Sequence, residues 1–175
     1  MDEEKQCLCN DMNRCWFAFY TKPRHEFKVA ENLAGISIVH YLPVVTRLKQ
    51  WSDRKKKVIE PLIRGYIFAF VNSKERLIAL QQDSIINCVC FNGKPASIPE
   101  WQIENLQRML KNESNFMISD VVKAGSKIKV LEGPFAGVEG IVKYTSEGRT
   151  ISITIDLLKR SITAVLPKES VIQIM

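Results

Sequence analysis

Seven cations and only two acids lie between residues 47 and 64. The acids are Asp53 and Glu60, and the cations are Arg47, Lys49, Arg54, Lys55, Lys56, Lys57 and Arg64. The whole chain has a net charge of +6, so this stretch carries most of the excess. A basic excess confined to one segment favours a polyanion partner, whereas a solvated hairpin tip without a ligand is the alternative. The chemistry expected here is electrostatic contact with phosphates.

The cysteines and histidines form no recognisable catalytic or metal-binding pattern. The cysteines are Cys7, Cys9, Cys15, Cys88 and Cys90, and their C-x-C spacings fit no common disulfide frame or zinc ribbon. We expect free thiols, as in a reducing cytoplasm, with a metal held by the first three cysteines as the alternative. The sequence also contains no Gly-rich phosphate loop, paired metal-binding histidines or nucleophile elbow. We therefore predict a protein without catalytic residues, cofactor or metal.

Composition and hydropathy favour a cytoplasmic protein with no membrane partner. Apolar residues make up 46% of the 175 residues and charged residues 25%, which is ordinary for a globular chain. The longest uncharged apolar run, Tyr66–Val71, is far too short to span a bilayer. Residues 1–15 contain acids in place of the basic start and apolar core of a secretory signal.

Hydrophobic periodicity predicts that the basic stretch lies on a hairpin within an α+β domain. Strands are expected at Trp16–Tyr20, Ile38–Arg47, Lys57–Leu62, Tyr66–Val71 and Asn87–Phe91. Helices are expected at Phe27–Gly35, from Asn72 through Leu80, and around a stripe of Ile103, Leu106, Met109 and Leu110. This order indicates a mostly antiparallel sheet covered by helices. The second and third strands form the hairpin, and its tip carries the cations and Trp51.

The C-terminal third of the chain changes to short β-branched runs separated by turns. Strands are expected at Lys127–Leu131, Val138–Tyr144, Thr150–Ile155, Ser161–Leu166 and Val171–Ile174. This pattern predicts a small β-barrel of SH3-like size. The predicted organisation is a disordered tail at 1–14, a first domain at 15–111, a linker at 112–120 and a barrel domain at 121–175.

One segment of the barrel resembles a KOW motif. Residues 125–142 read as an apolar strand, the pattern G-P-F-x-G-x-x-G, and a second apolar strand, with Gly133, Pro134, Phe135, Gly137 and Gly140 in register. We expect the three glycines to permit positive φ in a tight loop and the phenylalanine to close the end of the barrel. Ribosomal proteins also carry KOW motifs, so a ribosomal or general RNA-binding protein is one alternative function.

The first domain resembles the N-terminal domain of the NusG family. The segments that carry this resemblance are Trp16–Glu26 and Arg64–Phe70, and the likeness extends over residues 16–175. Arg47–Lys56 and Gly93–Ala96 are most similar to UpxY, a group of specialised NusG paralogues. The implied fold is an NGN α/β sandwich with a mostly antiparallel sheet, followed by an SH3-like KOW β-barrel.

The resemblance also implies partners and their sites. Tyr20, Tyr66 and Phe68 are expected to receive the β′ clamp helices of RNA polymerase, with the β side of the channel as a further contact. Lys22, Arg24 and the hairpin cations are expected to contact upstream duplex or non-template DNA, and Trp51 could stack on an unpaired base. A packed aromatic core and a packed turn tryptophan are the corresponding structural alternatives. The expected state is a monomer that associates with the nucleoid through polymerase.

The implied function is suppression of pausing and termination by a specialised antitermination factor, in a surface-polysaccharide operon. Housekeeping NusG, which couples polymerase to the ribosome or Rho, is the alternative within the family. The sequence departs from the family pattern at two places. Arg64 replaces a usual proline and adds charge at that turn, and Leu157–Arg160 replaces the usual Ile-Phe-Gly-Arg, which favours specialisation. The missing aromatic puts binding of ribosomal protein S10 or Rho through the KOW domain in doubt. The intact glycine loop predicts that the C-terminal domain stays a barrel.

Overall fold

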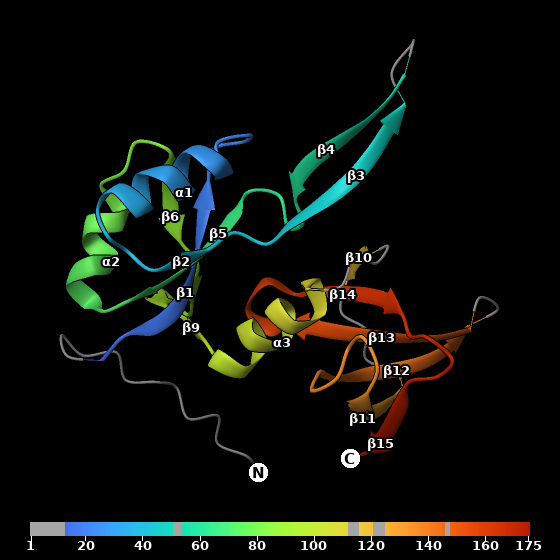
Figure 1. Ribbon diagram of the computed structural model, residues 1–175. Coiled ribbons are helices and arrows are strands. Elements are labelled where there is room, and N and C mark those ends of the chain that lie inside the picture. Colours follow the sequence, from blue (N-terminus) through green and yellow to red (C-terminus); the bar gives the residue numbers. More distant parts are fainter. Residues whose placement is uncertain (1–12, 51–53, 112–115, 121–124, 146–147) are drawn as a thin grey trace. The chain divides into compact units, whose positions relative to one another are not determined.

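A computed structural model describes residues 13–50, 54–111, 116–120, 125–145 and 148–175 (Figure 1). Contacts divide the chain into two compact units, Met1–Glu100 and Trp101–Met175. The first unit mixes helices with an antiparallel sheet, and the second carries a six-stranded sheet and one helix. The α+β prediction is therefore confirmed.

The first unit is built on a five-stranded sheet with β1 (Cys15–Thr21) at its centre. β1 pairs antiparallel with β5 (Tyr66–Val71), β6 (Ile85–Cys88) and β9 (Ser97–Ile98). The short β2 (His40–Tyr41) pairs with β5 on the other side. The strand order is thus β2-β5-β1-β6, and the apolar, aromatic sequence of β1 suits its central position.

Helices α1 (Glu26–Gly35) and α2 (Ser73–Leu80) contribute to the core of this unit. Alternate residues of β1 and β5, among them Phe17, Phe19 and Ile67, share one buried cluster with residues of both helices. Asn72 caps α2 as the sequence predicts: its side chain accepts from the Glu75 N–H at 2.9 Å, and Glu75 accepts from the Asn72 N–H at 3.0 Å. The period of two in the strands therefore determines which side chains meet the helices.

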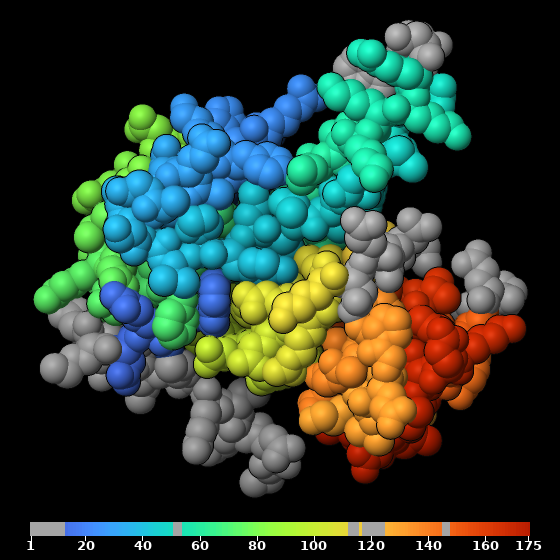
Figure 2. Space-filling model, in the orientation of Figure 1, coloured from blue at the N-terminus to red at the C-terminus, as the bar shows by residue number. Residues whose placement is uncertain are grey.

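The predicted hairpin consists of β3 (Val44–Gln50) and β4 (Lys55–Pro61). Among the described strands, these two pair only with each other. Figures 1 and 2 show the hairpin extending away from the sheet of the first unit. Pro43 lies between β2 and β3, where its missing N–H disrupts no strand pairing. A second, shorter hairpin joins β7 (Cys90–Phe91) to β8 (Lys94–Pro95).

The second unit contains all five strands that the sequence predicts for the barrel and one more. The predicted strands are β11 (Ser126–Glu132), β12 (Glu139–Thr145), β13 (Gly148–Ile155), β14 (Arg160–Val165) and β15 (Val171–Ile174). The additional strand β10 (Phe116–Asp120) lies within the predicted linker and pairs with β14. The order is β10-β14-β13-β12-β11-β15. The domain bounds deduced from the sequence stay a prediction, because contact units and sequence domains need not coincide.

The KOW loop connects β11 to β12 and closes over a buried phenylalanine. Phe135 is 1% exposed, and Gly133 and Gly137 have φ of 108° and 82°, as the sequence predicts. Gly140 differs from these two glycines, because its φ is not positive. A Cβ at Gly140 would lie 2.6 Å from the Ser152 carbonyl oxygen. Close strand packing, and not positive φ, therefore requires glycine there.

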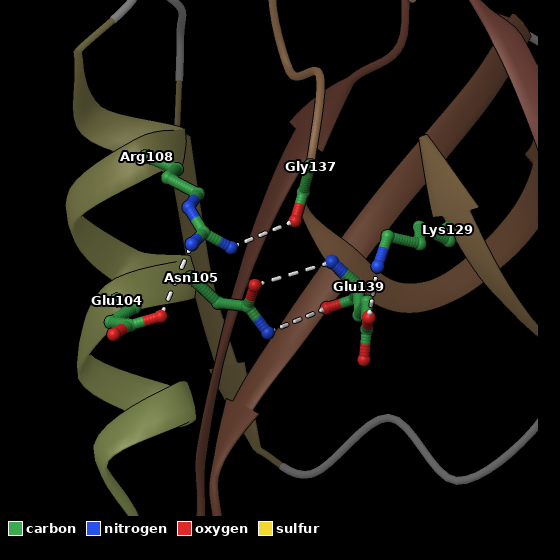
Figure 3. Close-up of polar contacts among 6 residues, drawn as sticks. All are labelled: Glu104, Asn105, Arg108, Lys129, Gly137 and Glu139. Carbon is green, nitrogen blue, oxygen red and sulfur yellow. Dashed lines mark hydrogen bonds and ion pairs between the residues drawn. The ribbon is translucent and has the colours of Figure 1, made fainter. Parts of the chain in front are cut away.

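Helix α3 (Glu100–Leu110) holds the KOW loop region through polar contacts (Figure 3). The Asn105 side chain donates to the Glu139 carbonyl at 3.2 Å and accepts from the Glu139 N–H at 3.3 Å. Arg108 donates to the Gly137 carbonyl at 3.1 Å, and Gln102 donates to the Asp156 carboxylate at 2.7 Å. Because Asn105 is buried, both its bonds compensate for lost water contacts.

Candidate functional site

The face of the β1–β5 sheet opposite the helix-packed residues carries a group of aromatic rings, here called the aromatic face. Its members are Trp16, Tyr20, Tyr41, Tyr66, Phe68 and Phe70. None of them belongs to the buried cluster that includes α1 and α2. Tyr20 lies directly opposite Tyr66 in the β1–β5 register, and their ring centroids are 5.3 Å apart. The period of two thus brings the predicted polymerase-binding residues Tyr20, Tyr66 and Phe68 onto one face.

Exposure varies along the aromatic face. Tyr20 is 38% exposed, Tyr66 is half-buried, and Phe68 is buried. Tyr41 stacks on Phe68 at 6.5 Å, and burial raises the pKa of the Tyr41 phenol well above its usual value. The face therefore combines accessible tyrosines with buried, neutral rings that support them.

The strand register divides the hairpin cations between two faces. Lys49 lies opposite Lys56, and Arg47 shares their face by the period of two. Lys55 and Lys57 belong to the other face, which also carries the exposed Leu48 and Ile59. Arg54 is exposed, and Trp51 lies outside the described residues. The basic cluster of the sequence is therefore two cationic surfaces and not one.

One carboxylate neutralises part of the charge at the base of the hairpin. Glu60 pairs with Lys49 and lies 3.7 Å from the Arg64 guanidinium. The hydrogen bond from Lys49, with the charges of Lys49, Arg64 and Arg47, lowers the pKa of Glu60 below its usual value. Glu60 therefore stays ionised at neutral pH and neutralises part of the positive charge of Lys49 and Arg64.

A cleft of about 730 Å³ lies between the hairpin base and the start of α1. Lys22 and Arg24 occupy the preceding turn, and both are exposed. Arg24, but not Lys22, lines the cleft together with Lys49 and Arg64. Sequence reasoning missed this cleft, because its walls come from segments that lie apart in the chain. The only indication of the cleft in the sequence is that two of its lining residues, Arg24 and Lys49, are both candidates for phosphate contact.

The cysteines require one correction. Cys15 is disulfide-bonded, in contrast to the free thiol expected from composition. Cys88 and Cys90 are free, and burial raises the pKa of the Cys88 thiol to about 12, which keeps it protonated. Within the described residues, no three His, Cys, Asp or Glu side chains are grouped as a metal site. Cys7 and Cys9 lie outside the described residues.

The loop between β13 and β14 keeps a glycine-like backbone without glycine. Asp156–Leu158 form a 3₁₀ turn, and Lys159 follows with φ of 51°. This left-handed conformation is the one that glycine favours. Lys159 corresponds to the glycine of the Ile-Phe-Gly-Arg pattern, while Leu158 replaces the aromatic. The backbone of the loop thus permits the turn although the aromatic side chain is missing.

Comparison with known proteins places this architecture in a family. The family model described as "Transcription termination factor nusG" matches residues 14–107. None of the curated proteins compared with the chain matches it significantly.

Two solved structures are similar to the chain. A structure on domain interaction in Thermotoga maritima NusG is 18% identical, has a TM-score of 0.52, and covers 92% of this chain and 98% of that one. A chain of the MjSpt4:Spt5 complex in conformation A is 13% identical, with a TM-score of 0.32, and covers 91% and 98%. No helix of the described chain is both long and apolar enough for a membrane span. Because the family model matches more than half of the 175 residues, the chain belongs to the NusG family of transcription factors.

Proposed function

We propose that this protein is a specialised antitermination and elongation factor that binds RNA polymerase through the aromatic face and DNA through the basic hairpin. The observation that carries the proposal is the pairing of Tyr20 with Tyr66 on a sheet face that is separate from the helix-packed core. Tyrosine suits an interface anchor because it provides a large rigid surface at low entropic cost. The partner proposed for this face is the β′ clamp helices, with the β side of the channel as a further contact.

The hairpin supports the second half of the proposal. It projects from the rest of the first unit (Figure 2). Its cations are divided between two faces, so phosphates can approach it from either side. Phosphate contacts give sequence-independent affinity that falls steeply with salt. The proposed ligand is upstream duplex or the displaced non-template strand, and Lys22 and Arg24 extend the positive surface toward α1.

The proposed mechanism requires no chemical step. A factor that joins the polymerase clamp to nearby DNA stabilises the elongating state of the enzyme relative to a paused one. It therefore shifts a population, by the difference in its affinity for the two states. Suppression of pausing and termination follows directly, and we propose a monomer acting in the cytoplasm, at the nucleoid.

The loop around Lys159 favours a specialised paralogue of the UpxY type over housekeeping NusG. Its backbone adopts the left-handed turn without glycine, but Leu158 lacks the ring expected for docking of ribosomal protein S10 or Rho. The resemblance of Arg47–Lys56 and Gly93–Ala96 to the UpxY paralogues implies a surface-polysaccharide operon, which is the target that we propose. Chromatin occupancy confined to one operon would support this assignment, whereas occupancy of nearly all transcribed genes would establish the housekeeping role.

Polymerase capture by variants of the aromatic face tests the interface. Tyr66→Ala removes an accessible ring, and we expect at least a tenfold loss of polymerase binding, since hot-spot rings contribute about 2 kcal/mol or more. Phe91→Ala is the matched control, because Phe91 is 60% exposed and lies outside the aromatic face. Circular dichroism checks that both variants are folded. Equal capture of Tyr66→Ala and wild type would exclude the aromatic face as the docking site.

A further inference from the structure

The pairing of the two tyrosines on the aromatic face depends on the turn that precedes β5. Gly65 is the last residue of this turn, and Tyr66 follows it as the first residue of β5. The Gly65 carbonyl accepts from the Thr21 N–H at 2.8 Å. This bond continues the β1–β5 register, in which Tyr20 lies opposite Tyr66. The conformation of the turn therefore determines how the two rings meet.

Gly65 also packs against the ring of Tyr20. Its φ is 79°, in the left-handed region that glycine favours, and a Cβ at this position would lie 3.1 Å from Tyr20 Cε2. The ring therefore lies close to the Gly65 backbone, with its centroid 5.3 Å from that of Tyr66. A change in the turn would move Tyr20 relative to Tyr66, although neither ring belongs to the turn.

One buried carboxylate holds this turn. Glu26, the first residue of α1, is 4% exposed, and its Oε1 accepts from the Gly65 N–H at 2.8 Å. The two residues are 39 positions apart, so the bond joins the start of α1 to the start of β5. A carboxylate is a strong acceptor, and the N-terminus of a helix favours negative charge. Burial of a carboxylate is costly unless it is hydrogen-bonded, which indicates that the contact to Gly65 is specific.

The residue before Gly65 makes this hydrogen bond more important than it would be in the family pattern. Arg64 stands where the resemblance to NusG gives a usual proline. Proline fixes φ at about −65° and restricts the unfolded chain, whereas arginine does neither. The Arg64 side chain is 75% exposed and its ion pair with Glu60 is 3.7 Å long, so it adds little restraint. The bond between Gly65 and Glu26 supplies the restraint that a proline would give.

We propose that Glu26 is a positioning residue of the polymerase interface, which fixes the turn at Gly65 and thereby the pairing of the two tyrosine rings. Glu26 acts through the Gly65 backbone and makes no contact with the polymerase itself. The proposal rests on the proposed function, which assigns the aromatic face to polymerase. It goes beyond that function, because it makes the docking geometry depend on a residue outside the aromatic face.

Equilibrium binding of the full-length protein to RNA polymerase tests this role with two substitutions that differ in the acceptor. Glu26→Met keeps the length of the side chain but removes the oxygen, and we expect polymerase affinity to fall about tenfold, the effect of misplacing a hot-spot ring. Glu26→Gln keeps an amide oxygen that accepts from the Gly65 N–H, so it should bind nearly as well as wild type. DNA affinity should not change in either variant, because the hairpin cations are untouched.

Asn72→Ala separates positioning from a general loss of stability. It breaks the capping box of α2, an element outside the aromatic face, and should lower the melting temperature by a few degrees. We expect it to bind polymerase like wild type. An equal loss of affinity in Asn72→Ala and Glu26→Met, at similar melting temperatures, would overturn the proposal. An equal loss in Glu26→Gln and Glu26→Met would also overturn it, because the partner would then require the carboxylate charge.

Arg64→Pro provides a rescue experiment. The φ of Arg64 is not positive, and its N–H donates no hydrogen bond within the described part of the chain, so a proline breaks none. Combined with Glu26→Met, it should restore part of the lost polymerase affinity by restraining the turn directly. Affinity no better than that of Glu26→Met alone would show that Glu26 does not act through this turn.

Nuclear Overhauser contacts between the Tyr20 and Tyr66 rings report the positioning without polymerase. These contacts should weaken in Glu26→Met and persist in Glu26→Gln and Asn72→Ala. If Tyr66→Ala leaves polymerase binding intact, the proposed function fails, whereas the ring contacts still show whether Glu26 sets the turn. Unchanged ring contacts in Glu26→Met would overturn the positioning role, even if polymerase affinity fell.

Discussion

The hairpin β3–β4 and the KOW barrel are both built from β-branched strands, but they use their side chains in opposite ways. In the hairpin most side chains are exposed, and its strands have no partner other than each other among those described. In the barrel the strand residues Ile128, Ile151 and Ile153 are buried. Hydroxyl pairs such as Ser152 with Thr163, at 2.7 Å, bond across β13 and β14. The difference supports the proposal that the hairpin serves binding, while the barrel contributes stability.

The largest expected effect is on the barrel. Phe135→Ala empties a fully buried site beneath the KOW loop, and we expect a loss of about 3–5 kcal/mol in the free energy of unfolding. Chemical denaturation followed by circular dichroism measures this change. A loss below about 1 kcal/mol would mean that the loop does not depend on this ring for its closure, and the contrast with the hairpin would weaken.

Arg149 provides the next test, because a single guanidinium joins β13 to the loop before β15. Its Nη2 donates to the carbonyls of Pro167, Lys168 and Ser170 at 3.2, 2.6 and 3.2 Å. Arg149→Met keeps the aliphatic stem but removes these bonds, so we expect a loss of about 2 kcal/mol in stability. Arg47→Met, a matched change on the hairpin, should alter stability by less than about 0.5 kcal/mol.

The two faces of the hairpin allow the binding role to be dissected. Arg47→Ala with Lys56→Ala removes cations from one face, and Lys55→Ala with Lys57→Ala removes them from the other. Each pair should weaken DNA binding and reduce the salt dependence by about one unit of slope per lost phosphate contact, without lowering the melting temperature. If one pair has no effect on DNA affinity, the DNA contacts only the other face.

Part of the structure that underlies this comparison can be predicted from the sequence alone. The strand period of two predicts that Tyr66 and Phe68 share a face, and the Asn72 capping box predicts where α2 begins. Tyr20 joins that face through the β1–β5 register, which the period does not supply. The same period places Lys55 and Lys56 on opposite faces of the hairpin. Local patterns succeed where neighbouring residues determine the structure.

Other features could not be read from the sequence, because they depend on residues that are distant in the chain. The cleft requires the end of β1, α1 and the hairpin together. β10 lies within the predicted linker, because the residues before Phe116 are polar and predict no strand. Its pairing with β14 joins segments that are distant in the chain. Gly140 illustrates the same limit, because its close approach to Ser152 comes from the neighbouring strand.

The smallest expected effect concerns the ion pair between Arg14 and Glu75, at 2.6 Å. Hydrogen bonding from Arg14, with support from the Asn72 N–H, lowers the pKa of Glu75 below its usual value. Its contribution to stability is therefore present above the unfolded pKa of about 4.5 and is lost as pH falls through the lower folded pKa. Glu75→Gln should flatten the melting temperature across this acidic range. An unchanged pH dependence would show that the pair adds nothing measurable.

Binding of the purified protein to an assembled elongation complex, in dilute buffer, tests the central claim most directly. The proposal predicts saturable binding that is lost in Tyr66→Ala and weakened by salt. No affinity for either the complex or free RNA polymerase would contradict it, whatever the stability of the two units.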